Sequence, residues 1–188
     1  MADANAPGSG PLQGTIKIVP YSGEYRVSML ETFRSNVPES FSPEEEAGFL
    51  KHVDSGEGAY MLWVQDGRVL ACGGYAFEGS CGVLCWGIVH RELQGRGLGR
   101  ALLALRIKLI YGHPEAESIR LETAPETESF FARYGFAVTL REPDGYGPGK
   151  TRVVMTARLD DAFRRHQAQL MREAGLDRPL IDPLSLTL

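Results

Sequence analysis

The sequence predicts a single α/β domain in which helices flank a mixed central sheet of six to seven strands. Three observations point to this class. Apolar and polar residues alternate in residues 15–21, the pair Asp66-Gly67 joins two apolar runs as a tight hairpin turn does, and residues 97–111 have helical periodicity directly after a strand. Hairpins make antiparallel neighbours and strand–helix–strand units make parallel ones, so the sheet is expected to contain both.

The first part of the chain predicts a strand over residues 15–21 and two helices over 23–36 and 42–53. Ser42 is expected to cap the second helix, with Pro43 at its first position. A hairpin over residues 59–79 and a further strand over 81–90 follow. The next helix runs from Gly97 to about Tyr111, and its apolar side consists of Leu98, Ala101, Leu102, Leu105, Leu109 and Ile110.

The second part of the chain predicts three more strands around one short helix. The strands are residues 118–123, 136–142 and 151–159, and the helix is 127–134, ended by Gly135. The order of elements therefore alternates strand–helix–strand units with hairpins, as expected of one α/β domain.

The two ends of the chain differ in composition from this domain, which spans residues 15–159. Residues 1–14 are rich in Ala, Gly, Pro and Ser and are expected to be a disordered lead-in. Residues 160–188 predict one polar helix followed by an apolar tail broken by prolines. Because such a tail would expose several leucines, we expect it to pack on its own domain or on a second subunit of a homodimer.

Composition argues against several classes of function. The net charge of −4 leaves no basic surface for nucleic acid, and no apolar run is long enough to span a membrane. The odd number of cysteines, Cys72, Cys81 and Cys85, favours free thiols and a cytoplasmic protein. The C-x3-C spacing of the last two lacks further ligands, so no metal is expected.

Residues 94–99, "QGRGLG", place glycines between a strand and a helix, where main-chain N–H groups are free to bind an anion. A diphosphate is the ligand expected there; the alternative is that the glycines only make a tight turn from strand to helix. The stretch is not a Walker A loop, which needs Lys after its last Gly, nor a G-x-G-x-x-G dinucleotide loop.

In these residues the chain resembles the GCN5-related N-acetyltransferase (GNAT) superfamily. The stretch at 94–99 matches the family's pyrophosphate loop, "WGIVHREL" (86–93) is similar to the strand before it, and "FFARYGF" (130–136) is similar to its later helix–strand signature. The resemblance covers residues 15 to 159. It implies a sheet in which the parallel strands 82–90 and 118–123 splay apart to receive acetyl-CoA as co-substrate.

The resemblance also assigns residues to the co-substrate. Pyrophosphate contacts are implied for the loop and the helix start, namely Gln94, Gly95, Arg96, Gly97, Leu98, Gly99, Arg100 and Ala101. Main-chain groups of Ile88, Val89 and His90 are expected to pair with pantetheine, as an added strand would, and a strand N–H near Val89 to polarise the thioester carbonyl. Thr127, Phe130 and Phe131 are expected near the thiol end.

The activity implied is acetyl transfer to a primary amine of a small molecule or peptide, by direct attack. The family's usual acid, a tyrosine, is replaced here by Phe131. We therefore expect Glu122 as base and Tyr134 as acid, with a surface carboxylate and a core aromatic as the respective structural alternatives. Other candidates are Glu78, Glu128 and His90 for the base, and Tyr75, Tyr146 or water for the acid.

Two other functions remain open at this point. The missing tyrosine and the C-terminal extension also suit an inactive acyl-CoA-binding sensor, and a transferase for a longer acyl chain would need more room than Trp86, Phe130 and Phe131 suggest. The acceptor is expected to meet residues 25–53 and the Gly/Pro-rich loop 142–150, but its identity cannot be read from the sequence.

Overall fold

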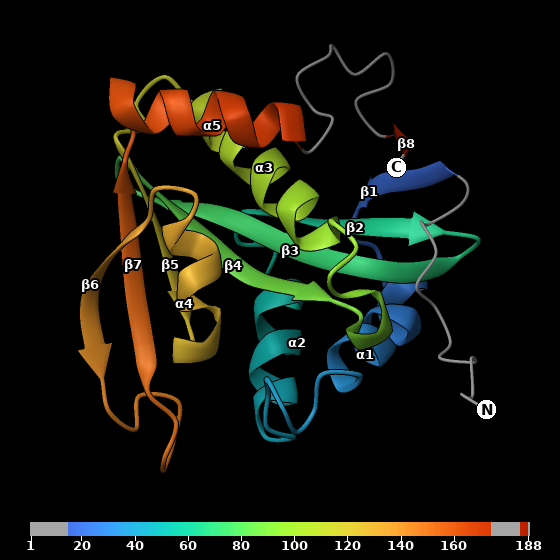
Figure 1. Cartoon of the computed structure of the whole chain (residues 1–188). Helices are drawn as coiled ribbons and strands as arrows, with labels where there is room; N and C mark the ends of the chain where they lie inside the picture. Colours follow the sequence, from blue (N-terminus) through green and yellow to red (C-terminus); the bar gives the residue numbers. More distant parts are fainter. Residues whose placement is uncertain (1–14, 174–184, 188) are drawn as a thin grey trace, which may run out of the picture.

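The computed structural model describes residues 15–173 and 185–187, and it confirms the α/β class (Figure 1). The helices and strands, in chain order, are β1 (Thr15–Pro20), the 3-10 helix Gly23–Tyr25, α1 (Arg26–Arg34), α2 (Glu45–Ser55), β2 (Ala59–Gln65), β3 (Arg68–Glu78), β4 (Cys81–Val89), the 3-10 helix Arg91–Leu93, α3 (Leu98–Tyr111), β5 (Ser118–Thr123), α4 (Pro125–Ala132), β6 (Ala137–Glu142), β7 (Arg152–Arg158), α5 (Asp161–Glu173) and β8 (Ser185–Thr187).

One mixed sheet runs through the molecule in the order β6-β7-β5-β4-β3-β2-β1-β8. Strands β4 and β5 pair in parallel, and the other neighbours pair antiparallel. Seven strands were predicted. The eighth, β8, comes from the C-terminal tail and was missed, because three residues are too few to show an alternating pattern.

Helices cover both faces of this sheet (Figure 1). On one face, Phe33 of α1 and Phe49 of α2 pack against buried side chains of β2, β3 and β4. On the other face, the apolar side of α3 packs against β3 and β4, α4 packs against β7, and α5 packs against α3. The two cores hold the sheet between them, and β4 contributes buried residues to both: Leu84 to one and Ile88 to the other.

Some element boundaries differ from the predicted ones. Helix α2 begins at Glu45, so Ser42 is not its cap; instead the Ser42 main-chain N–H donates to the Glu45 carboxylate at 2.6 Å. Helix α4 begins at Pro125 rather than residue 127, since proline's fixed φ suits the first turn of a helix. The predicted hairpin turn is confirmed, with φ of 50° at Asp66 and 78° at Gly67.

Helix α5 lies across α3 (Figure 1). Its buried side chains are Phe163, Gln167 and Leu170, and the Phe163 ring meets that of Phe136 at 5.7 Å between centroids. The predicted lead-in 1–14, and residues 174–184 and 188 of the predicted tail, lie outside the described residues. Among the helices described, none has the length and apolar character needed to cross a membrane.

Candidate active site

The site is built around the point where β4 leaves β5. Their parallel pairing ends at Leu84 opposite Leu121, while β4 continues to Val89 alongside β3. The register between β3 and β4 shifts beside Trp86, whose φ of 40° marks a bulge in β4. The splayed parallel pair expected from the resemblance is thus confirmed, and it leaves the end of β4 with one edge unpaired by β5.

The glycine loop follows β4 and leads into α3. Gly97 is the N-cap residue of α3, with φ of 90°, and Gly95 has φ of 76°. Both values lie in the left-handed region that L side chains rarely adopt, so glycine is needed for this path. The Ala101 N–H makes a 3.0 Å bond to the Gly97 carbonyl, as in the first turn of a helix. The N–H groups before it have no acceptor inside α3 and give this end a positive potential.

Asn36 fixes the loop to the end of β4. It is 1% exposed, and its amide nitrogen donates to the Val89 carbonyl at 3.0 Å and the Thr32 carbonyl at 3.0 Å. Its amide oxygen accepts from the Gln94 side chain at 2.7 Å. One buried side chain after α1 therefore sets the direction in which the loop leaves the strand.

The three residues predicted to pair with pantetheine, Ile88 and Val89 of β4 and the following His90, face different ways. Ile88 lies opposite Cys72 of β3, and the His90 N–H donates to the Leu70 carbonyl at 2.9 Å, so His90 uses its N–H toward β3. Alternate residues of a strand present their main-chain groups to opposite edges. Val89 therefore presents its main chain to the unpaired edge, where Asn36 occupies its carbonyl.

The His90 ring contacts Arg68 of β3. Its Nε2 is 2.9 Å from a guanidinium nitrogen of Arg68, which must donate, so the proton of the neutral ring resides on Nδ1. Burial and the Arg68 charge lower the pKa of His90, and its buried Nδ1 has no hydrogen-bond partner among the described residues. This environment suits a neutral imidazole.

The aromatic residues of α4 lie near the start of α3. A side chain at Gly99 would meet Val89 Cγ2 at 3.8 Å and Phe130 Cζ at 4.0 Å, so these two side chains border the loop. Phe131 packs edge-on against Phe130 at 5.0 Å, and Tyr134 is 8% exposed with its ring 5.3 Å from that of Phe130. This burial favours core packing over proton donation as the role of Tyr134.

The charged groups at the end of β5 form one connected set. Glu122 accepts from Arg152 at 2.9 Å, and Arg152 also bonds Glu142 at 2.6 Å. Burial, and then the negative charge of Glu122, raises the pKa of Tyr146 to about 12, so this phenol keeps its proton at neutral pH. The structure thus joins Glu122 and Glu142, which lie on different strands, through Arg152.

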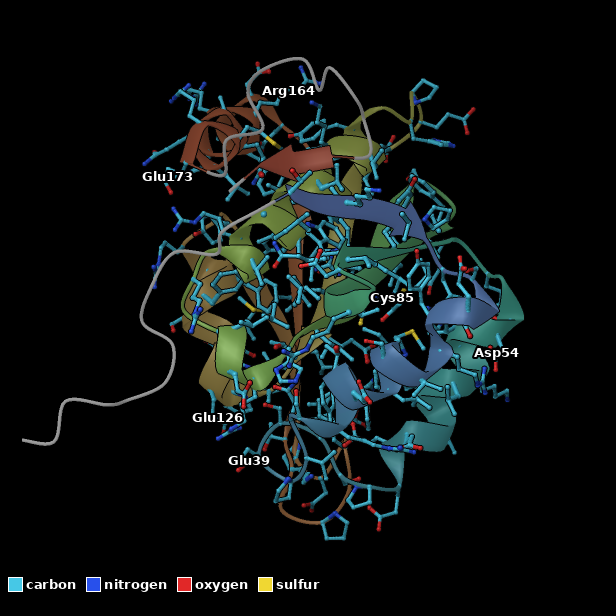
Figure 2. All side chains as sticks on the ribbon, turned by 90° about the vertical axis from the view of Figure 1, so that its right-hand side faces the viewer. Glu39, Asp54, Cys85, Glu126, Arg164 and Glu173 are labelled. Atoms are coloured by element: carbon cyan, nitrogen blue, oxygen red, sulfur yellow. The ribbon has the colours of Figure 1, made fainter. Side chains whose placement is uncertain are left out.

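Thr127 lies in the first turn of α4, where its hydroxyl contacts that of Thr123 and donates to the Ala124 carbonyl at 3.0 Å. Glu126 of the same turn and Glu39, which follows α1, lie at one end of the molecule, and Arg164 and Glu173 of α5 lie at the other (Figure 2). Across residues 15–173 and 185–187, no three His, Cys, Asp or Glu side chains are grouped to hold a metal ion.

Sequence reasoning missed Asn36, Arg152 and the buried Arg106 of α3. Each acts through partners distant in the chain: Asn36 through Val89, and Arg152 through Glu122. No local spacing carries such a signal. An Arg on the apolar side of a helix, as at position 106, was the one visible irregularity.

Comparison with known proteins identifies the family. The profile of the acetyltransferase (GNAT) family matches residues 25–136, which include the glycine loop and the Phe130–Phe136 signature. The chain belongs to this family. No curated protein matches the sequence.

Solved structures share the fold at low sequence identity. One is described as a GNAT-family acetyltransferase from Desulfovibrio desulfuricans, with a TM-score of 0.63 and 20% identity over 77% of this chain and 99% of that one. An aminoglycoside 6'-N-acetyltransferase complexed with coenzyme A has a TM-score of 0.62 and 14% identity over 76% and 97%. The ribosomal-protein-S18-alanine N-acetyltransferase of Escherichia coli has a TM-score of 0.62 and 18% identity over 77% and 94%. At such identities the likeness establishes the fold.

Proposed function

We propose that this protein transfers the acetyl group of acetyl-CoA to a primary amine of a small molecule or peptide, by direct attack of the amine. The observation that carries the proposal is the glycine loop with φ of 90° at Gly97, which opens α3 beside the unpaired end of β4. The aminoglycoside and ribosomal-protein acetyltransferases that share the fold act on amines of both kinds.

The residues present fit the co-substrate. Main-chain N–H groups of the loop and of Arg100, at the positive end of α3, would bind the diphosphate. Glycine at positions 95, 97 and 99 leaves the backbone free of side chains where the diphosphate would approach it closely. The unpaired edge of β4 at Val89 offers a strand-like partner for an amide chain. Acetyl-CoA supplies an activated acyl group, so the protein needs no metal for this chemistry.

Proton handling is assigned to the charged set at the end of β5. Glu122 takes the amine's proton, directly or through water, while the Val89 N–H polarises the carbonyl that is attacked. We favour Tyr146 over Tyr134 as the proton donor to the leaving thiolate, because the Glu122 charge acts on the Tyr146 phenol whereas Tyr134 is packed among core aromatics. Phe131 in the place of the family's tyrosine requires such a substitute.

A second candidate is an acyl-CoA-binding sensor without turnover, favoured by the same Phe131. A binding and turnover experiment separates the two. The purified chain is heated with coenzyme A or acetyl-CoA, and free thiol release is followed with a panel of small amines and peptides. Ligand at 100 times Kd should add about 2.7 kcal/mol to the free energy of unfolding. Binding with turnover supports the enzyme, binding without turnover supports the sensor, and no binding overturns both.

The role of Glu122 is tested against Glu142, because both carboxylates bond the same arginine. We expect Glu122→Gln to lower kcat about 100-fold or more, as loss of a general base does. Glu142→Gln should lower it by less than about threefold, since Glu142 lies on β6. Equal effects of the two changes would mean that Glu122 only helps to hold Arg152.

We further propose that the protein works in the cytoplasm and forms a homodimer. The three cysteines Cys72, Cys81 and Cys85 are free thiols, as a reducing compartment allows. Sedimentation of the full chain at micromolar concentration tests the dimer; a single monomeric species would refute it.

A further inference from the structure

Arg106 is a buried cation whose hydrogen-bond partners in the described part of the chain are main-chain carbonyls. It lies in α3, is 4% exposed, and donates to three main-chain carbonyls: Leu102 at 3.1 Å, Gly74 at 3.4 Å and Cys85 at 3.5 Å. No carboxylate among the described residues forms an ion pair with it. Burial lowers its pKa to about 10, which still leaves it charged at neutral pH.

The sheet is shaped to receive this side chain. A Cβ atom at Gly87 would lie 2.8 Å from Arg106 Nη2, and one at Gly73 would lie 3.2 Å from Nη1. Two glycines, one on β4 and one on β3, thus leave the space that the guanidinium fills. Burying a charge costs free energy unless the charge is compensated, so the presence of both the arginine and the space for it indicates a use for the charge.

The guanidinium meets β4 at its bulge. Arg106 holds the Cys85 carbonyl, and from β2 the Tyr60 hydroxyl donates to the Trp86 carbonyl at 2.9 Å. The C=O and N–H of one trans peptide point in opposite directions. Because Arg106 holds the Cys85 carbonyl, the Trp86 N–H of the same peptide points away from Arg106. Likewise, because Tyr60 holds the Trp86 carbonyl, the Gly87 N–H points away from Tyr60. Figure 2 labels Cys85 on this stretch, within the outline of the molecule.

We propose that Arg106 is a positioning residue for acyl transfer. It fixes the Cys85–Gly87 bulge, from which β4 continues to the Val89 N–H that polarises the thioester carbonyl in the proposed reaction, and its charge favours the negative charge that develops on the thioester oxygen and the leaving sulfur. Arg106 exchanges no proton and forms no bond to the substrate; it acts through the β4 main chain and through its field, which is strong because water is excluded. This inference rests on the proposed acetyl-CoA chemistry.

The effect of Arg106→Met on stability distinguishes a purely structural role of Arg106 from a functional one. Replacing an uncompensated buried charge by a hydrophobic side chain is often neutral or stabilising. We therefore expect Arg106→Met to unfold at the same temperature as the wild type or higher. A structural role would instead make the variant lose stability and activity together.

The experiment compares four variants of the full chain with the wild type. Arg106→Met removes the charge, Arg106→Lys keeps it, and Gly87→Ala displaces the guanidinium while leaving the arginine in place. Ile107→Met, a volume-conserving change at the next buried position of α3, controls for repacking. Each protein is measured for thermal midpoint, coenzyme A affinity, KM and kcat. The thiol pKa of bound coenzyme A is taken from thiolate absorbance, with the ligand-free protein subtracted for its own cysteines.

The expected result is a fall in kcat for Arg106→Met of about 10- to 100-fold, with KM for acetyl-CoA and coenzyme A affinity within about threefold of wild type. The thiol pKa of bound coenzyme A should rise by about one unit, since a neighbouring cation favours the thiolate. Arg106→Lys should restore most of both values, and Gly87→Ala should lower kcat in the same direction.

Two outcomes overturn the inference while leaving the proposed function standing. One is an unchanged kcat and thiol pKa in Arg106→Met. The other is a loss that Ile107→Met reproduces or that a lower melting temperature accompanies. If Arg106→Met does not fold, an unchanged kcat in Gly87→Ala overturns it instead. A wild type that does not bind coenzyme A removes the proposed function, and this inference with it.

Discussion

Asn36 shows how much of the site depends on single side chains outside the glycine loop. Its amide joins the end of α1, the last residue of β4 and Gln94 at the loop entrance, in an environment 1% exposed to solvent. A buried amide can hold such a junction because its donor and acceptor groups face different partners.

Asn36→Ala is expected to raise the KM for acetyl-CoA about tenfold and to lower the free energy of unfolding by ~1–3 kcal/mol, because it leaves the partners of the amide unsatisfied. Steady-state kinetics and urea unfolding check both values. Thr32→Val is the matched control, since it removes a buried side-chain bond from α1 to the Val69 carbonyl of β3 and keeps the Thr32 carbonyl that Asn36 contacts. A comparable rise in KM for the control would show that Asn36 acts through stability alone.

For single residues, the sequence shows which residue occupies a motif position but not which distant side chains it contacts. The replacement of the family's tyrosine by Phe131 is visible in the sequence alone, and the structure places that ring against Phe130 and Phe136. The pairing of Glu122 with Arg152 and the burial of Arg106 against Gly73 and Gly87 join distant residues. Such contacts follow from sheet order, which periodicity does not reveal.

At the scale of elements, the entrance to α3 is where backbone conformation and ligand binding meet. Gly97 and Gly79 are a matched pair of glycines: both have positive φ, 90° and 60°, and an added Cβ would meet no atom within 4 Å at either. Gly79 lies in the turn between β3 and β4, and Gly97 caps the helix.

Gly97→Ala and Gly79→Ala should each lower the free energy of unfolding by ~1–2 kcal/mol, since an L side chain is strained at positive φ. Coenzyme A affinity should fall about tenfold or more in Gly97→Ala, because the loop's N–H groups move, and should be unchanged in Gly79→Ala. Calorimetric titration with coenzyme A measures the difference. Equal affinities for the two variants would show that the loop does not bind the diphosphate.

Elements with strong local signals were predicted well. The strand Ser118–Thr123 has the predicted bounds, and α3 begins one residue after the predicted Gly97. The start of α2 was misplaced because the Ser42-Pro43 pair resembles a capping sequence, whereas the chain uses the Glu45 carboxylate to accept the Ser42 N–H. Local rules of this kind offer several solutions, and the surrounding packing selects one.

On the scale of the whole molecule, two partly buried histidines couple folding to pH. Burial is the main cause that lowers the pKa of His52 on α2, and burial followed by the Arg68 charge lowers that of His90. In the unfolded chain both should titrate near ~6.5. Below that pH the unfolded state binds protons that the folded state does not yet bind, so stability falls as the pH falls.

We expect the urea midpoint to be level between pH 7 and 8 and to decrease from about pH 6.5 downward. His52→Gln should make the decrease shallower, because one of the two groups no longer titrates. Urea unfolding at half-unit pH intervals measures both curves. A midpoint that rises between pH 6.5 and 5.5, or a slope that His52→Gln leaves unchanged, would contradict the assignment.

The pairing of β8 with β1 has a consequence for how the protein is made. Thr15 lies opposite Thr187, so the outer edge of β1 finds its partner only after residue 187 has been synthesised. Throughout translation that edge offers unpaired main-chain groups to any neighbouring nascent chain. The three residues of β8 therefore cover this strand edge late in synthesis. Chains released from the ribosome before residue 185 would leave the edge of β1 unpaired and able to pair with other chains during aggregation.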